Sequence, residues 1–253
     1  MSNSPLVNVV RISPNKTSPR RHAIDRITIH MTVGQLTPET LGEIFARPAR
    51  KASSNYGIGY DGRVGMYVEE MDRAWTSSSG ENDHQAVTIE VSSETFSPYT
   101  VTDDAFRKLL DLVKDICIRN GKKKLLWISN RERALNYKPA DDEMILTIHR
   151  WFASTLCPGA YLLSRHAEIA QTVTERIKEE MDYEDFKKCM TRYEAEQKDL
   201  PADNWAVDSL DWAVENGIME GDGHGNLMPM ANVTREQFAT MLHRFADKLT
   251  GKA

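Results

Sequence analysis

The chain has 253 residues, of which 40% are hydrophobic and 27% are charged, and its formal net charge is −5. This composition is typical of a folded globular protein of one or two domains and excludes a disordered chain. Residues 180–253 carry 15 acidic and 8 basic side chains, a net −7, which leaves +2 on residues 1–179 and provides no basic surface for nucleic acid.

The sequence argues against a membrane-spanning helix and against a disulfide framework. No stretch approaches the ~20 apolar residues that a membrane-spanning helix needs. Residues 1–5 lack a basic segment followed by an apolar one, so we expect no secretory signal. The three cysteines, Cys117, Cys157 and Cys189, form an odd number without framework spacing, which argues against a disulfide scaffold.

The first half of the chain alternates between strand and helix patterns. Residues 24–30 alternate with period two and predict a strand. Thr37 is a suitable N-cap for a helix over residues 38–47. We expect a strand at 55–60 and a second at 63–68, joined by the turn Asp61-Gly62. A polar loop at 76–84 and a further strand at 86–92 follow.

The next segments complete a domain of intermixed helices and strands. An apolar stripe with helical spacing runs from Thr102 to a C-cap at Asn120-Gly121. Strands are expected at 125–128 and 144–148, and a closing helix from Tyr161 or Ser164 to Ile177. This order predicts an α/β domain with a central sheet flanked by helices.

The remaining residues predict a small helical domain after a connector. A charged helix over 183–198 is broken at 200–203. Two further helices follow, one ending at Asn216-Gly217 and one beginning at Thr234, where Gln237 completes a capping box. Residues 222–226 are similar to a calcium loop, but Val233 stands where its bidentate glutamate is needed, so we expect a turn. The predicted boundaries are 1–180, 181–200 for the linker, and 201–253.

Three residues form a candidate metal site. His149 and Cys157 are eight positions apart, and His30 ends the first predicted strand. Two imidazoles and one thiolate are a ligand set for a catalytic zinc, which keeps its fourth position open for water. A thiol-hydrolase dyad of His149 and Cys157 is an alternative, but it leaves His30 unexplained.

Four segments occur in an order that is more specific than any one of them: residues 27–32, 54–62, 86–91 and 149–159. Together they resemble the zinc-dependent N-acetylmuramoyl-L-alanine amidases of the type 2 amidase and peptidoglycan-recognition-protein family. The resemblance covers roughly residues 8–178. It implies a central mixed sheet flanked by helices, and Zn²⁺ bound by His30, His149 and Cys157.

The resemblance also implies roles in the reaction. Glu90 stands in a strand block where phage amidases of this family place a glutamate, and we expect it to act as general base. Thr155 occupies a position at which many relatives carry an oxyanion-stabilising lysine, and a hydroxyl provides weaker stabilisation there. Ser54 stands where some relatives have a tyrosine.

Several polar and aromatic residues are candidates to line a glycopeptide groove. Alternatively, Trp75 is a core side chain and His84 a solvated loop residue. The candidates for substrate binding are Asn55, Tyr56, Trp75, Asn82, His84 and Arg150.

The last fifty residues resemble one S-layer homology repeat. The blocks that carry this resemblance are 205–219, 221–229 and 233–239. In that family an arginine helps to bind an anionic secondary cell-wall polymer, which implies this role for Arg235. The alternative is a capping box beside a solvated arginine. Such repeats generally work in threes, so a single copy implies a weak site, assembly into a dimer or trimer, or a structural appendage.

These features predict a peptidoglycan hydrolase that cleaves the amide between N-acetylmuramic acid and the L-alanine of the stem peptide. The layout resembles a bacteriophage endolysin held in the host cytoplasm before lysis, and a bacterial autolysin remains an alternative. The alternatives from other classes are a non-hydrolytic peptidoglycan-binding protein, which would typically lack Cys157, and a wall-anchoring protein that acts through its C-terminal repeat.

Overall fold

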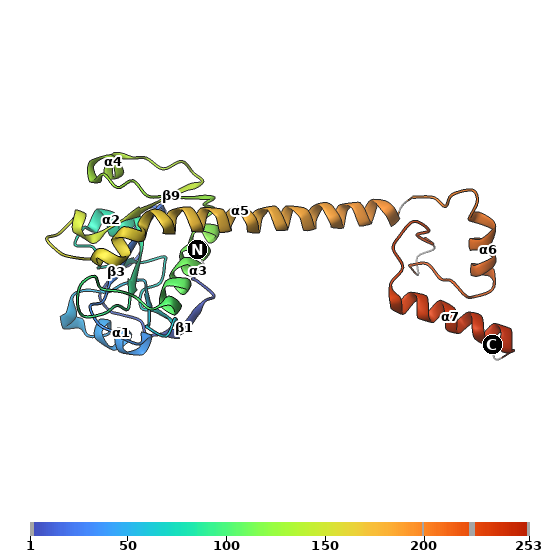
Figure 1. Cartoon of the computed structure of the whole chain (residues 1–253), viewed down its shortest axis with the longest axis horizontal. Helices are drawn as coiled ribbons and strands as arrows, with labels where there is room; N and C mark the ends of the chain where they lie inside the picture. Colours follow the sequence, from blue (N-terminus) through green and yellow to red (C-terminus); the bar gives the residue numbers. More distant parts are fainter. Residues whose placement is uncertain (1–2, 199, 223–225, 252–253) are drawn as a thin grey trace. The chain divides into compact units, whose positions relative to one another are not determined.

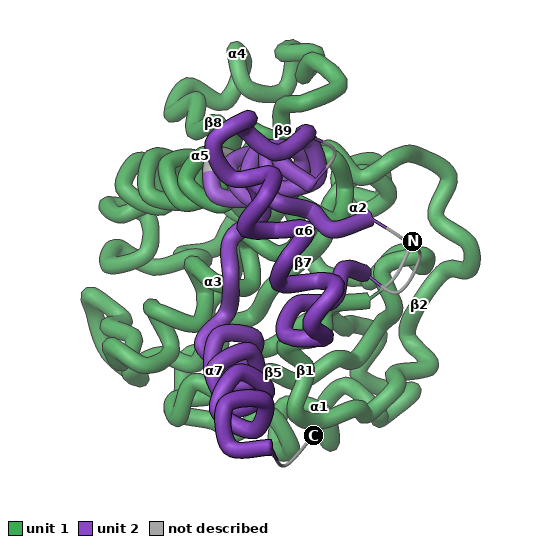
Figure 2. Tube along the Cα trace, turned by 90° about the vertical axis from the view of Figure 1, so that its right-hand side faces the viewer, with its two compact units in different colours: residues 1–180 green, residues 181–253 purple. Residues whose placement is uncertain are grey.

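The computed structural model describes residues 3–198, 200–222 and 226–251. It divides into two compact units, Met1–Glu180 and Met181–Ala253, which Figure 2 distinguishes by colour. Their boundary falls within the helix α5 (Gly159–Lys198). None of the helices in the described part of the chain combines the length and the apolar character that a membrane crossing requires.

The first unit is built on a seven-stranded mixed sheet (Figure 1). Its strands, in spatial order, are β1 (Val7–Val10), β5 (Val64–Met66), β4 (Tyr56–Ile58), β7 (Ala86–Val91), β3 (Arg26–Met31), β9 (Glu143–Thr147) and β8 (Lys124–Leu126). Only the hairpin of β4 and β5 pairs antiparallel among these strands. The predicted α/β class with a mixed central sheet is therefore confirmed.

The two faces of the sheet differ in chemistry. On β3 and β7, Ile27, Ile29, Val87 and Ile89 belong to one apolar core that also contains side chains of α3 (Asp103–Arg119) and of the first part of α5. The residues between them point to the opposite face, because side chains alternate along a strand. That second face carries polar residues: Thr28, His30, Thr88 and Glu90.

Short helices and two short strands surround this polar face and its edges. They are α1 (Pro38–Phe45), α2 (Gly80–Gln85), α4 (Arg131–Asn136), the 3₁₀ turns η1 (Pro48–Arg50) and η2 (His149–Trp151), and the pair β2 (Lys16–Thr17) and β6 (Arg73–Ala74). Thr37 caps α1 through the Thr40 amide, as predicted. The residues 76–84, which we expected to form a loop, instead contain most of α2.

One further prediction about helices is corrected, and another is confirmed. The closing helix and the charged connector form one helix, α5, because residues 160–198 contain neither glycine nor proline to end it. In the second unit, α6 (Val207–Glu215) and α7 (Arg235–Thr250) are present, and Thr234 and Gln237 form the predicted capping box. The predicted turn at 222–226 lies partly outside the described residues.

Gly57 on β4 leaves room for a buried tyrosine. It lies in register with Glu90 of β7, and a Cβ atom there would stand 2.6 Å from Cε2 of Tyr67. Tyr67 is fully buried, and its hydroxyl donates to the Pro38 carbonyl at 2.8 Å, so the ring cannot move away. The glycine is therefore required by close packing.

We expect Gly57→Ala to lower the free energy of unfolding by about 1–3 kcal/mol, as overpacking does in other cores. Denaturant unfolding of the purified variant measures this difference. Gly34→Ala is the matched control, because a Cβ atom at Gly34 meets only ordinary contacts at 3.7 Å. Equal stability of the Gly57 variant and the wild type would show that Tyr67 can be displaced at no cost.

Candidate metal centre

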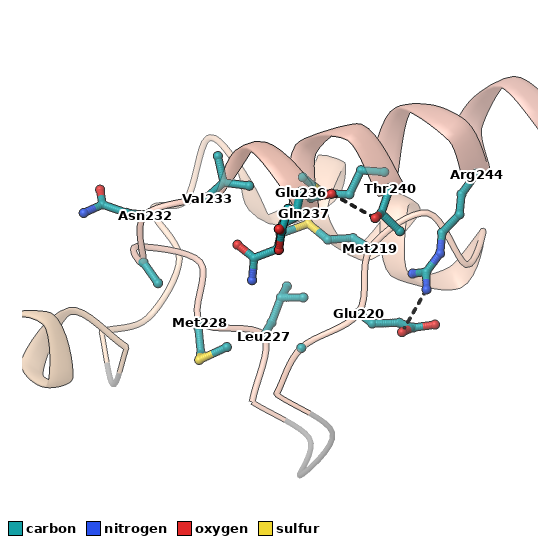
Figure 3. Close-up of a pocket in the computed structure, with 13 residues that line it drawn as sticks. Met219, Glu220, Leu227, Met228, Asn232, Val233, Glu236, Gln237, Thr240 and Arg244 are labelled. Carbon is teal, nitrogen blue, oxygen red and sulfur yellow. Dashed lines mark hydrogen bonds and ion pairs between the residues drawn. The ribbon is translucent and has the colours of Figure 1, made fainter.

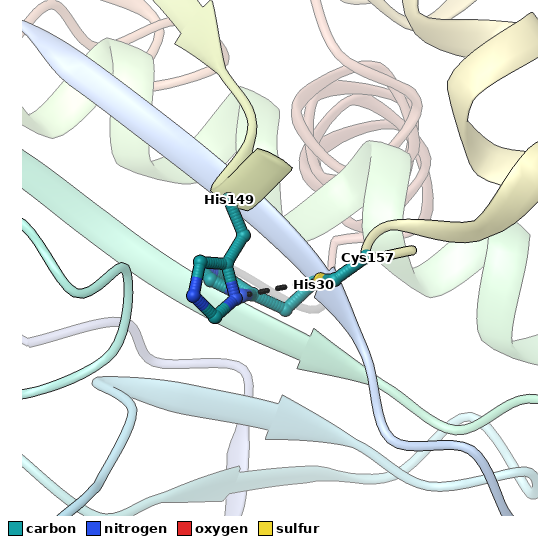
Figure 4. A group of neighbouring side chains, drawn as sticks. All are labelled: His30, His149 and Cys157. Atoms are coloured by element: carbon teal, nitrogen blue, oxygen red, sulfur yellow. Dashed lines mark hydrogen bonds between the residues drawn. The ribbon is translucent and has the colours of Figure 1, made fainter. Parts of the chain in front are cut away.

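His30, His149 and Cys157 converge at one end of the sheet (Figure 4). His30 lies near the end of β3, and His149 follows the neighbouring parallel strand β9. Their ligand atoms and the Cys157 sulfur all lie within 4.8 Å of one another. His30 Nδ1 is 3.4 Å from Cys157 Sγ, and the two imidazole centroids are 5.0 Å apart. We call these residues the His–His–Cys cluster.

The cluster has the protonation states expected of a metal site, and one of its buried nitrogen atoms lacks a hydrogen-bond partner among the residues described. Burial and the neighbouring His149 lower the pKa of His30 to about 3, and burial also lowers the pKa of His149. Both rings are therefore neutral ligands at pH 7. Burial raises the pKa of the Cys157 thiol, and the Glu90 charge adds to this rise, so a nearby cation is needed to ionise the thiol. His30 Nε2 is buried without a hydrogen-bond partner in the described structure. These residues fit a divalent ion.

Glu90 lies beside the cluster. It is in register with His30 on adjacent parallel strands, so both side chains project from the same face of the sheet. Burial raises the pKa of its carboxyl to about 8, against the opposing charge of Arg50. Among the described residues it has no hydrogen-bond or ion-pair partner, which leaves it free to exchange a proton near neutral pH.

The loop that carries Cys157 is held by two of the predicted site residues. Thr155 Oγ1 accepts a hydrogen bond from the Cys157 amide at 3.2 Å, and Arg150 Nη2 donates to the Leu156 carbonyl at 2.7 Å. Arg150 is half-buried and contributes to the shape of this loop. The Thr155 hydroxyl retains its own proton as a donor.

The prediction that Asn55, Tyr56 and Asn82 bind substrate is corrected by their burial. Each is at most 1% exposed. The Asn55 amide donates to the Val68 carbonyl and accepts from the Thr88 amide, while the Tyr56 hydroxyl donates to Glu70 at 2.7 Å. These side chains satisfy polar groups inside the fold and present no surface to a ligand in this structure.

Asn82 has a different role, which its position in the sequence does not reveal. Its side-chain nitrogen donates to Thr28 Oγ1 at 2.9 Å, and its oxygen accepts from Thr147 Oγ1 at 3.1 Å. These threonines lie two residues before His30 and His149. Asn82 therefore ties together the two strands that supply the imidazoles.

The last two groove candidates lie at the periphery of α2 and β6. Trp75 is partly exposed, and its indole nitrogen donates to Thr17 Oγ1 at 2.9 Å. His84 is 8% exposed on α2, where its Nδ1 accepts from the Arg21 amide. Of the two, only Trp75 keeps substantial surface for a ligand.

Sequence reasoning missed Ser78 and Arg50. Ser78 Oγ lies 3.2 Å from His149 Nε2, and Arg50 is an exposed cation whose charge acts on Glu90. Ser78 belongs to a uniformly polar run, and Arg50 to a stretch with two other basic residues, Arg47 and Lys51, so no local pattern distinguishes either one.

The second unit contains a separate cavity of about 330 Å³ (Figure 3). It is formed by α7 and the segment before it, with an ion pair of 3.1 Å between Glu220 and Arg244 at its margin. Arg235, the residue predicted to bind wall polymer, is exposed and is not part of this lining.

The fold and the cluster define a mixed-sheet α/β protein with a His–His–Cys centre able to hold a metal ion. Residues 20–160, more than half of the chain, match the family model described as N-acetylmuramoyl-L-alanine amidase. The chain belongs to this family. Residues 198–239 match the model of the S-layer homology domain.

Individual proteins resemble separate parts of the chain. A stretch of 44 residues is 41% identical to the S-layer protein sap of Bacillus anthracis, covering 17% of this chain and 5% of that protein. The chain thus spans only a small part of this relative. Among solved structures, N-acetylmuramoyl-L-alanine amidase LysC from Clostridium intestinale URNW is 17% identical, with 65% of this chain and 95% of that chain covered and a TM-score of 0.46. A mutant endolysin from Bacillus subtilis is 12% identical, with 66% of this chain and 99% of that chain covered and a TM-score of 0.47.

Proposed function

We propose that this chain is a zinc-dependent peptidoglycan hydrolase that cleaves the amide between N-acetylmuramic acid and the L-alanine of the stem peptide. The observation that carries this proposal is the convergence of two neutral imidazoles and a buried thiol beside a carboxyl whose pKa is about 8. Membership of the amidase family supports the choice of bond.

His30, His149 and Cys157 would hold the zinc ion. When bound, zinc polarises the scissile carbonyl and acidifies a water molecule. This ion suits the set because zinc accepts nitrogen and thiolate sulfur together, whereas magnesium and calcium select oxygen ligands.

Glu90 carries out the proton transfers in this proposal. Its ionised carboxylate accepts a proton from the attacking water, whose oxygen forms the new bond to the carbonyl carbon. The carboxylic acid then donates that proton to the alanine nitrogen as the C–N bond breaks. Thr155 donates its hydroxyl hydrogen to the carbonyl oxygen as negative charge develops there.

The second unit, in this proposal, holds the enzyme on the wall through a secondary cell-wall polymer. The match of residues 198–239 to the S-layer homology domain supports this. We further propose that the protein is a bacteriophage endolysin that stays in the host cytoplasm until the membrane opens. A bacterial autolysin with the same activity is the alternative.

The proposal is tested by incubating purified peptidoglycan with the zinc-loaded chain and with a fragment of residues 1–180. We expect both to generate new L-alanine amino termini, detected by labelling and mass spectrometry of the released stem peptides. The fragment should bind intact walls less than the full chain does. Tight binding to walls without any release of peptides would instead identify a non-hydrolytic recognition protein.

A further inference from the structure

Ser78 contacts the His–His–Cys cluster from outside. Its Oγ lies 3.2 Å from Nε2 of His149, within hydrogen-bond distance of that nitrogen. Ser78 has a backbone φ of 64°, in the left-handed region that residues with a Cβ atom rarely adopt. Such backbone strain persists only where the surrounding structure enforces it, and it is concentrated at functional sites.

The loop around Ser78 is fixed by a buried carboxylate. Asp83 accepts hydrogen bonds from the Thr76 amide at 3.0 Å and from the Ser77 amide at 3.1 Å. Ser79 follows directly and caps α2 by accepting from the Asn82 amide. Hydrogen bonds to the residues before and after Ser78 therefore fix the backbone that positions the Ser78 hydroxyl.

The same loop is attached to the strands that carry the imidazoles. The Asn82 side chain donates to Ser77 Oγ at 3.2 Å as well as to Thr28 of β3, and it accepts from Thr147 of β9. The loop that carries Ser78 is thus hydrogen-bonded, through Asn82, to the same two strands that position His30 and His149.

We infer that Ser78 is a positioning residue for the metal centre: its Oγ accepts the Nε2 hydrogen of His149, which directs the unprotonated Nδ1 toward the ion. A neutral imidazole carries one N–H, and the partner of that N–H selects which nitrogen can coordinate. In this inference, the strained backbone at Ser78 is what places this acceptor beside His149. The inference rests on the proposed function, which supplies the bound ion.

The experiment compares Ser78→Ala and Ser78→Gly with the wild type in the full-length protein. Competition with a chromogenic chelator measures zinc affinity, and we expect both variants to bind zinc about tenfold more weakly, as for other outer partners of metal-binding histidines. Nitrogen NMR of the metal-free protein should show a smaller Nε2–H fraction at His149. Ser164→Ala, on the exposed part of α5, is the control and should match the wild type.

Ser78→Gly distinguishes the effect of losing the hydrogen bond to His149 from the effect of relieving the backbone strain. Glycine adopts a φ of 64° freely, so the melting temperature of the metal-free variant should equal or exceed that of the wild type while its zinc affinity falls. Wild-type affinity and an unchanged His149 tautomer in both variants would overturn the inference alone. A wild type that binds no zinc would overturn the proposed metal and the inference together.

Discussion

Replacing Glu90 by glutamine is expected to lower the rate of stem-peptide release by about 100- to 10,000-fold, the range in which a general base contributes. Glutamine has nearly the same shape but cannot accept the proton of the attacking water. Because Glu90 is not a member of the His–His–Cys cluster, zinc content should remain at the wild-type level. Metal analysis and product release, measured on the same preparation, test both expectations.

The raised pKa of Glu90 adds a test that does not depend on activity. Burial places this pKa at about 8 in the folded chain, above the ordinary value of 4.5. The folded state therefore binds more protons than the unfolded state between these values, and stability falls as pH rises through that window. Metal-free Glu90→Gln lacks this loss, so its stability relative to the wild type should increase from pH 5 to pH 8. The role of Glu90 would be refuted if the free energies of unfolding of the variant and the wild type differed by the same amount at every pH in this range and the variant were fully active.

Replacing Cys157 by serine is expected to remove zinc from the protein. The substitution exchanges a thiolate ligand for a hydroxyl that does not ionise at neutral pH. The loss of affinity should exceed about 100-fold, the upper range for partners outside the ligand set. Chelator competition measures the affinity. Cys189→Ser is the matched control, because Cys189 is an exposed thiol on α5 outside the cluster, and it should bind zinc like the wild type.

The Cys157 thiol also gives zinc binding a characteristic pH dependence. Burial raises its pKa, so the thiol is protonated at pH 7 before metal binds and must release its proton on binding. The affinity of the wild type should therefore rise about tenfold per pH unit between pH 6 and pH 8. An affinity for zinc that is independent of pH, or equal in Cys157→Ser, would exclude Cys157 as a ligand.

The strand that carries His30 could be predicted from a pattern that is local in sequence. The alternation of residues 24–30 identifies a strand, and His30 lies near its end. The short helix α2 could not be predicted in the same way. Three serines precede it and its own residues are glycine and polar or charged side chains, a composition typical of a loop. The helix depends on the Ser79 cap and on contacts of Asp83 and Asn82.

The prediction that Asn55 and Asn82 line a groove is contradicted by their burial, for a related reason. Asn55 and Asn82 are polar residues near the site, and polarity alone suggests exposure to a ligand. Here the second face of the sheet carries threonines, whose buried hydroxyls need partners. The two amides supply those partners, and no local periodicity distinguishes this role from substrate contact.

Asn82 has a consequence for the metal binding proposed for this chain. It joins β3 to β9 by side-chain hydrogen bonds that require no ion, so the imidazoles are brought together when the chain folds. Small zinc domains, in contrast, are unfolded until the metal arrives. Under the proposed function, the entropy of bringing the two imidazoles together would therefore be lost during folding and not when the ion binds. Synthesis of the chain and loading of the proposed ion would then be separable events.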